Sequence, residues 1–145
     1  MAEPAVPFER HYVDRVLSRP VRDAAFARAV QIAYGATCGV TELKIINGGG
    51  RAEVQAAHIR PVARQGPDSV RNGVALCGTV HWMFDRGLIS FGPPPDYRIL
   101  VTGRGLPEAA LRLLNPERRL LKPADQRWWP APSYCEYHRS SVFKP

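Results

Sequence analysis

The sequence lacks the features that would place the chain in a membrane or hold it together with disulfides. Its 145 residues include only three cysteines, and no two of them form a Cys-x-x-Cys pair. An odd, widely spaced set of this kind cannot form a closed disulfide framework and does not resemble a zinc ribbon. The longest apolar runs have four residues, far fewer than the ~20 that cross a bilayer, and the amino terminus has no apolar signal segment. These absences predict a cytoplasmic protein that does not associate with a membrane.

Lysine is also scarce, which gives the positive charge a distinct character. The 20 basic residues outnumber the 13 acidic residues, for a net charge of +7, and 17 of the 20 are arginine. The planar guanidinium group suits phosphate oxygens better than the point charge of lysine does, so the composition favours a nucleic-acid partner. A GC-rich genome would also raise arginine over lysine, so the charge alone leaves both explanations open.

The length and the 45% hydrophobic content are typical of one folded domain with its own core. Prolines and mixed charge predict an amino-terminal arm at 1–20, with a helical turn near 9–17. We expect the folded domain to occupy 21–145. Its last part, from 115 onward, is rich in proline and aromatic residues and ends in a predicted helix.

Local patterns predict the order of the elements in this domain. Apolar residues at helical spacing predict a helix over 21–34. The Asn-Gly-Gly-Gly turn at 47–50 predicts a β-hairpin that pairs 37–46 with 53–59. The further elements expected are a loop at 60–73, a buried strand at 74–77, a short helix between Thr79 and Gly87, a second hairpin of 88–91 and 97–101, and helices at 107–114 and 133–140.

The residues able to carry chemistry gather in two short motifs. Residues 56–61 have the sequence AAHIRP and residues 81–87 have the sequence HWMFDRG, with Asn72 between them. His81 and Asp85 are four residues apart on the predicted helix and so share one face. An imidazole and a carboxylate placed in this way can bind a divalent cation at two points. His58 ends a predicted strand, where its ring can project beside that helix.

With these motifs in order, the segment 38–91 resembles the HNH endonucleases, in the branch with A-H-I-x-P and H-x-x-F-D-x-G motifs. Thirteen residues separate His58 from Asn72 and eight separate Asn72 from His81, which is the order and spacing of the family's signature residues. The resemblance implies an α+β fold: a ββα-metal core with an N-terminal helix, and an extension at 92–145 with a second β-hairpin and a C-terminal helical tail. It also implies a metal-dependent endonuclease, which is a phosphodiester hydrolase.

The resemblance also assigns roles to individual residues. His58 would be the general base that takes a proton from water, Asn72 would orient the loop beside it, and His81 would bind the metal ion. One divalent ion is implied, with Mg²⁺ expected first and Mn²⁺, Ni²⁺ or Zn²⁺ as alternatives. Many HNH enzymes carry Asp or His immediately before the catalytic histidine, whereas this chain has Ala57 there.

Asp85 is therefore our candidate for a second metal ligand, at i,i+4 from His81. Asp68 lies in a loop beside a proline, where nothing in the sequence determines its direction. An ion pair of Asp85 with Arg86 or Arg60 is the alternative. On the ligand hypothesis, an aspartate introduced at position 57 would rebuild the commoner ligand pair and restore part of the activity lost without Asp85.

The predicted substrate is DNA, either double- or single-stranded. Arginines near the motifs would contact backbone phosphates without selecting a base sequence; they are Arg60, Arg64, Arg71 and Arg86. A solvated basic surface is the alternative for these side chains. Two other functions stay open: a catalytically weak nucleic-acid-binding module, or the nuclease part of a restriction, phage or anti-phage system that a partner protein targets. A homodimer is also left open.

Overall fold

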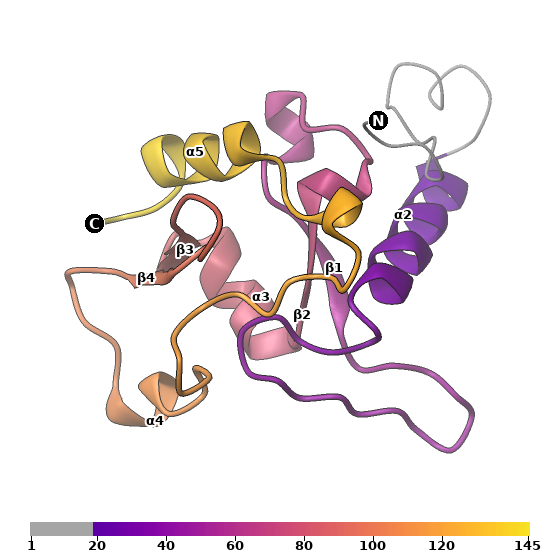
Figure 1. Ribbon diagram of the computed structural model, residues 1–145, viewed down its shortest axis with the longest axis horizontal. Helices are drawn as coiled ribbons and strands as arrows, with labels where there is room; N and C mark the ends of the chain where they lie inside the picture. The colour runs from indigo at the N-terminus through magenta and orange to yellow at the C-terminus, as the bar shows by residue number, and fades with distance from the viewer. Residues whose placement is uncertain (1–18) are drawn as a thin grey trace.

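The computed structural model describes residues 19–145 and confirms the predicted α+β class (Figure 1). The expected arm at 1–20 and its helical turn lie, except for residues 19 and 20, outside the described residues. The elements are α2 (Arg19–Ala33), β1 (Gln55–His58), β2 (Gly73–Leu76), α3 (Gly78–Asp85), β3 (Ile89–Phe91), β4 (Ile99–Val101), α4 (Glu108–Leu111) and α5 (Pro132–Ser141), with 3₁₀ turns at Val62–Arg64, Val70–Asn72 and Gln126–Trp128. None of the described helices has the length and apolar character that a bilayer span requires.

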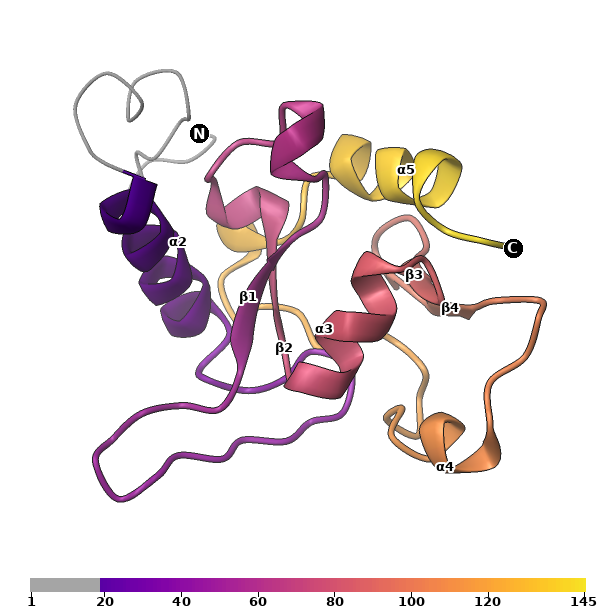
Figure 2. The ribbon, with the colours of Figure 1, turned by 180° about the vertical axis from the view of Figure 1, so that it is seen from behind.

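The antiparallel strands β1 and β2 occupy the centre of the fold, with α2 on one side and α3 on the other (Figures 1 and 2). Every residue of β2 is buried, and its first residue, Gly73, pairs with His58. A Cβ atom on Gly73 would lie 2.5 Å from a Val30 methyl group and 3.0 Å from the ring of Phe26. The glycine therefore allows α2 to pack closely against β2, at the position that pairs with His58 of β1.

The hairpin predicted between 37–46 and 53–59 is wrong in its strand pairing. β1 pairs with β2 instead, and the earlier segment meets the chain before β1 only at a bridge between Ile46 and Ala52. Residues 42–51 are all exposed, whereas residues 74–76 are fully buried. Pairing with β2 therefore places the central strands against the hydrophobic core, which a ribbon exposed on both faces would not do.

The later elements are confirmed, with some ends shifted. β3 and β4 form the second hairpin, in which Ile89 pairs with Val101. The loop at 60–73 contains two of the 3₁₀ turns, α4 is shorter than the helix predicted at 107–114, and α5 matches the predicted terminal helix. In Figure 1, α5 lies above β3 and β4, so the tail returns to the α3 side of the core.

His138 fastens α5 to this part of the core. Its Nε2 lies 3.0 Å from the carbonyl oxygen of Phe84, and its Nδ1 lies 2.7 Å from Oγ of Ser90. A carbonyl oxygen only accepts, so Nε2 carries the hydrogen and Nδ1 accepts from the serine hydroxyl. The ring also stacks on Phe84, with centroids 3.9 Å apart. Burial lowers the pKa of His138 from 6.5 to about 4, although the Phe84 carbonyl and Asp85 oppose this shift.

We expect His138 to make the fold sensitive to acid. The pKa of His138 is about 4 in the folded chain, whereas its ordinary value, expected in the unfolded chain, is 6.5. Between these two pH values, the unfolded chain therefore binds more protons than the folded chain. The free energy of unfolding should fall as the pH falls through this window, by about 3 kcal/mol in all. Urea unfolding of the wild type and of His138→Gln from pH 4 to pH 7 measures the effect. An equally steep pH dependence in both proteins would contradict it.

Candidate active site

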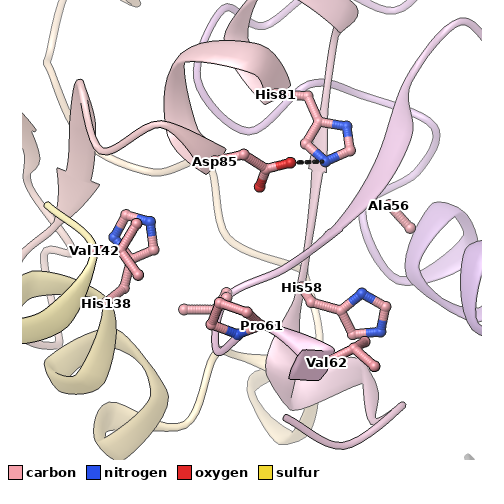
Figure 3. Close-up of a pocket in the computed structure, with 9 residues that line it drawn as sticks. Ala56, His58, Pro61, Val62, His81, Asp85, His138 and Val142 are labelled. Atoms are coloured by element: carbon pink, nitrogen blue, oxygen red, sulfur yellow. Dashed lines mark ion pairs between the residues drawn. The ribbon is translucent and has the colours of Figure 1, made fainter. Parts of the chain in front are cut away.

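A cleft of about 350 Å³ brings three of the predicted site residues together (Figure 3). His58 comes from the end of β1, whereas His81 and Asp85 come from α3. His138 and Val142, in and just after α5, line the opposite side. Segments that are far apart in the sequence therefore form one cleft.

His81 and Asp85 face each other in this cleft, with 3.1 Å between Nε2 and Oδ2 (Figure 3). On the other side of the ring, Nδ1 of His81 lies 2.7 Å from Oε1 of Gln55, the first residue of β1. An outer partner of this kind orients an imidazole toward a metal ion. Nε2 and the carboxylate are thereby directed at each other, as two donors to a single cation would be.

Asp85 does not make the ion pairs that the alternative required. The guanidinium group of Arg86 lies over the ring of Trp82, 4.1 Å from its centroid. That of Arg60 lies 4.4 Å from the ring centroid of Tyr137. The carboxylate of Asp85 is paired with His81 instead.

The donors present fit a single hydrated divalent ion. One imidazole nitrogen and one carboxylate oxygen suit Mn²⁺ or Ni²⁺ well, and the carboxylate suits Mg²⁺, which keeps several water ligands. Within residues 19–145, no group of three or more His, Cys, Asp or Glu side chains is placed to hold a metal ion. Among the described residues, His81 and Asp85 would therefore supply two ligands, and water or substrate oxygen would complete the coordination.

His58 is held from the side of β1 that faces α2. Its Nε2 lies 2.8 Å from Oδ1 of Asp68, and its ring stacks on Phe26 with centroids 4.0 Å apart. Side chains alternate along a strand, so His58 and Gln55, three positions apart, point to opposite faces. In Figure 3 the ring of His58 is turned away from the pair formed by His81 and Asp85. His58 and that pair share the cleft but lie on different sides of it.

Asp68 is the site residue that the sequence reasoning missed. The structure buries it completely and directs one carboxylate oxygen at His58. The other oxygen, Oδ2, lies 3.6 Å from a guanidinium nitrogen of Arg19 in α2. The one signal in the sequence was the position of Asp68 between His58 and Asn72, within the loop that the family motif already placed at the site.

Asn72 is buried and acts on this loop rather than on the cleft. Its Oδ1 accepts from the backbone N–H of Arg60 at 2.8 Å, and its Nδ2 donates to the carbonyl oxygens of Arg60 and Pro67 at 3.1 and 3.0 Å. The loop returns so closely that a Cβ on Gly66 would lie 1.8 Å from the Arg60 oxygen. Asn72 thus joins the two ends of the loop that links His58 to Asp68.

Ala57 is fully buried in the hydrophobic core. This burial argues against the expectation that an aspartate at position 57 would rebuild a pair of metal ligands. A carboxylate there would be surrounded by core residues and would lose its hydration. We no longer expect an aspartate at position 57 to restore activity, because a buried unpaired charge is costly.

Ala57→Asp should therefore lower the free energy of unfolding by several kcal/mol, the scale expected for a buried unpaired charge. Ala56→Asp is the matched control, because Ala56 is only half-buried and lines the cleft. Urea unfolding of the two variants beside the wild type gives the comparison. Equal stability of Ala57→Asp and Ala56→Asp would show that position 57 can open to solvent.

The four predicted nucleic-acid contacts have different surroundings. Arg64 and Arg86 are exposed, whereas Arg60 and Arg71 are half-buried. Nε of Arg60 donates to the carbonyl oxygen of Arg64 at 2.7 Å. Nε of Arg71 donates to the carbonyl oxygen of Trp129 at 3.0 Å. This bond to the tail explains the position of the Arg71 side chain without any contact to a nucleic acid.

Comparison with known proteins shows which family the chain resembles. Residues 36–92 match the family model of the HNH endonucleases. A solved structure described as a modification-dependent TagI restriction endonuclease matches with a TM-score of 0.61 and 27% identity over 88% of this chain. This chain spans only 40% of the length of that protein. No curated protein matches the chain. Residues 36–92 are therefore similar to the HNH endonucleases, which confirms the resemblance that the motifs predicted.

Proposed function

We propose that this chain is a metal-dependent endonuclease that hydrolyses phosphodiester bonds in DNA. One observation carries the proposal: the segment that matches the HNH family model places two histidines at a single cleft, and each is paired with a carboxylate. His58 is paired with Asp68, and His81 is paired with Asp85. The first pair suits proton transfer, and the second suits a divalent cation.

Each side chain has a separate task in the proposed reaction. His81 and Asp85 would hold the ion, which, when bound, would stabilise negative charge on the phosphate and on the departing oxygen. His58 would take the proton from the attacking water. Asp68 would keep the ring oriented and stabilise the charge that the ring gains when it takes the proton, as the aspartate of a catalytic triad does. Asn72 would keep the loop between them in place.

DNA is the proposed substrate for two reasons. The related solved structure is described as a restriction endonuclease, and this chain has a net charge of +7. Exposed arginines near the cleft, Arg64 and Arg86, would contact phosphates. Since the chain corresponds to 40% of that relative, we propose that it supplies cleavage and that another domain or a partner protein supplies the choice of target. The cytoplasmic location and a homodimer stay predictions.

Incubation of the purified protein with supercoiled plasmid tests the proposal. We expect cleavage in Mg²⁺ or Mn²⁺ and none in EDTA, and the double variant His58→Ala/His81→Ala should be inactive. Ni²⁺ and Zn²⁺ extend the panel. Salt-sensitive DNA binding with no cleavage in any of the four ions would instead support a catalytically weak binding module, for which the absence of a metal ligand at Ala57 is the supporting observation.

A further inference from the structure

Residues 43–53, which we call the finger, project from the body of the molecule between α2 and β1 (Figures 1 and 2). Asn47 shapes the tip: its Oδ1 accepts from the N–H groups of Gly49 and Arg51, each at 2.9 Å. The two sides of the finger meet at the bridge between Ile46 and Ala52. The finger is therefore a thin ribbon with an ordered turn, and most of its surface faces solvent.

A groove of about 520 Å³ separates the finger from α2. Gln31 lines it from α2, and Asn47 and Arg51 line it from the finger. Its floor includes Gln55 and Ala56 of β1. Ala56 also lines the candidate active site, so the groove and the cleft adjoin along β1. A chain lying in the groove would reach His58 at the end of the same strand.

The finger also concentrates exposed aliphatic side chains. Six large hydrophobic residues are exposed within the described part of the chain. Three of them, Leu43, Ile45 and Ile46, belong to the four-residue stretch 43–46 of the finger. Single exposed hydrophobic residues are ordinary, but a cluster of them on a projecting segment marks a contact surface.

The cations of the finger, Lys44 and Arg51, have no counterion among the described residues. Within residues 19–145, neither Lys44 nor Arg51 forms an ion pair or a side-chain hydrogen bond, and both are exposed. The carboxylate in the groove, Glu53, accepts a hydrogen bond from the N–H of Gly78 at 3.0 Å. The groove therefore presents a guanidinium group that is available to an anion, together with side-chain amides and aliphatic carbons.

We propose that the groove and finger bind duplex DNA beside the phosphate that is cut. Arg51 contacts a backbone phosphate, and Ile45 and Ile46 lie against sugars and base edges in the minor groove, where proteins commonly place aliphatic side chains. The inference rests on the proposed nuclease function. A docked protein segment would also cover the aliphatic side chains, but the unpaired cations and the continuity with the cleft favour a polyanion.

Two finger variants and two matched controls test the inference. The finger variants are Arg51→Ala and Ile45→Ser/Ile46→Ser. The controls are Arg104→Ala, an exposed arginine after β4, and Ile32→Ser, an exposed isoleucine of α2 outside the groove. Each protein is assayed on plasmid and on bis(p-nitrophenyl) phosphate, a small phosphodiester that lacks the flanking backbone phosphates of DNA. Duplex binding is measured against salt in a His58→Ala background.

We expect plasmid cleavage by the finger variants to fall about 10-fold more than their hydrolysis of the small phosphodiester, the scale of one charged hydrogen bond. Arg51→Ala should also reduce the log–log salt slope of duplex binding by about 0.9. The controls should match the wild type. Finger variants that cut and bind like the controls would overturn the inference and leave the nuclease proposal intact. A wild type that cleaves neither substrate would overturn the nuclease proposal, and the salt slope would still decide whether the finger binds DNA.

Discussion

Replacing His58 with alanine should lower the rate of plasmid cleavage by about 10²–10⁴-fold, the usual contribution of a general base. The expectation rests on its position at the cleft and on its bond to the buried carboxylate of Asp68. Without the imidazole, solvent must take the proton from the attacking water. Single-turnover cleavage at saturating protein measures the chemical step separately from DNA binding.

Metal and DNA binding serve as the controls for this variant. Both affinities should stay close to those of the wild type, because the ring of His58 is turned away from the pair formed by His81 and Asp85. Calorimetric titration with Mn²⁺ gives the metal affinity. A loss of metal affinity as large as the loss of rate would show that His58 is a ligand, and the roles assigned here would then be wrong.

Asp68→Asn tests the positioning role of the aspartate. An amide can still accept a hydrogen bond from His58, but it cannot stabilise the charged ring, so kcat should fall while KM changes little. Asp68→Glu should recover part of the rate if its carboxylate reaches the ring. A uniform loss of folded protein, with normal kcat in the folded fraction, would show that Asp68 has only a structural role.

Asp85→Ala should abolish cleavage in Mg²⁺ and leave some in Mn²⁺ or Ni²⁺. A hard cation such as Mg²⁺ binds oxygen ligands and associates poorly with imidazole alone, whereas Mn²⁺ and Ni²⁺ bind imidazole more strongly. His81→Ala should reduce activity with all three ions, because the nitrogen ligand that Gln55 orients is then lost. Plasmid cleavage against the concentration of each ion gives the comparison.

Glu136→Ala provides the matched control, because Glu136 is an exposed carboxylate of α5 that does not line the cleft. Its metal dependence should follow that of the wild type. Full activity of Asp85→Ala in Mg²⁺ would remove Asp85 from the proposed ligand set. The centre would then depend on one histidine, water and the substrate phosphate.

Local patterns in the sequence were enough to predict the resemblance to the HNH endonucleases, the fold class and most of the helices. The order and spacing of His58, Asn72 and His81 identified the HNH segment, which the family match confirmed. Hydrophobic periodicity located α2, and the i,i+4 spacing placed His81 and Asp85 on one face of α3. These predictions succeed because each depends on neighbours within one or two helical turns, which the sequence shows directly.

Only the tertiary structure decided which strand pairs with β1, which carboxylate meets His58 and which alanine is in the core. A turn motif predicted that β1 would pair with the segment before it, but β1 pairs with the buried strand β2. Asp68 is directed at His58 because Asn72 closes the loop between them. Ala57 is buried because its strand lies between two helices. Each of these outcomes depends on contacts between segments far apart in the chain, and the free energy of such contacts comes from burial that no local pattern records.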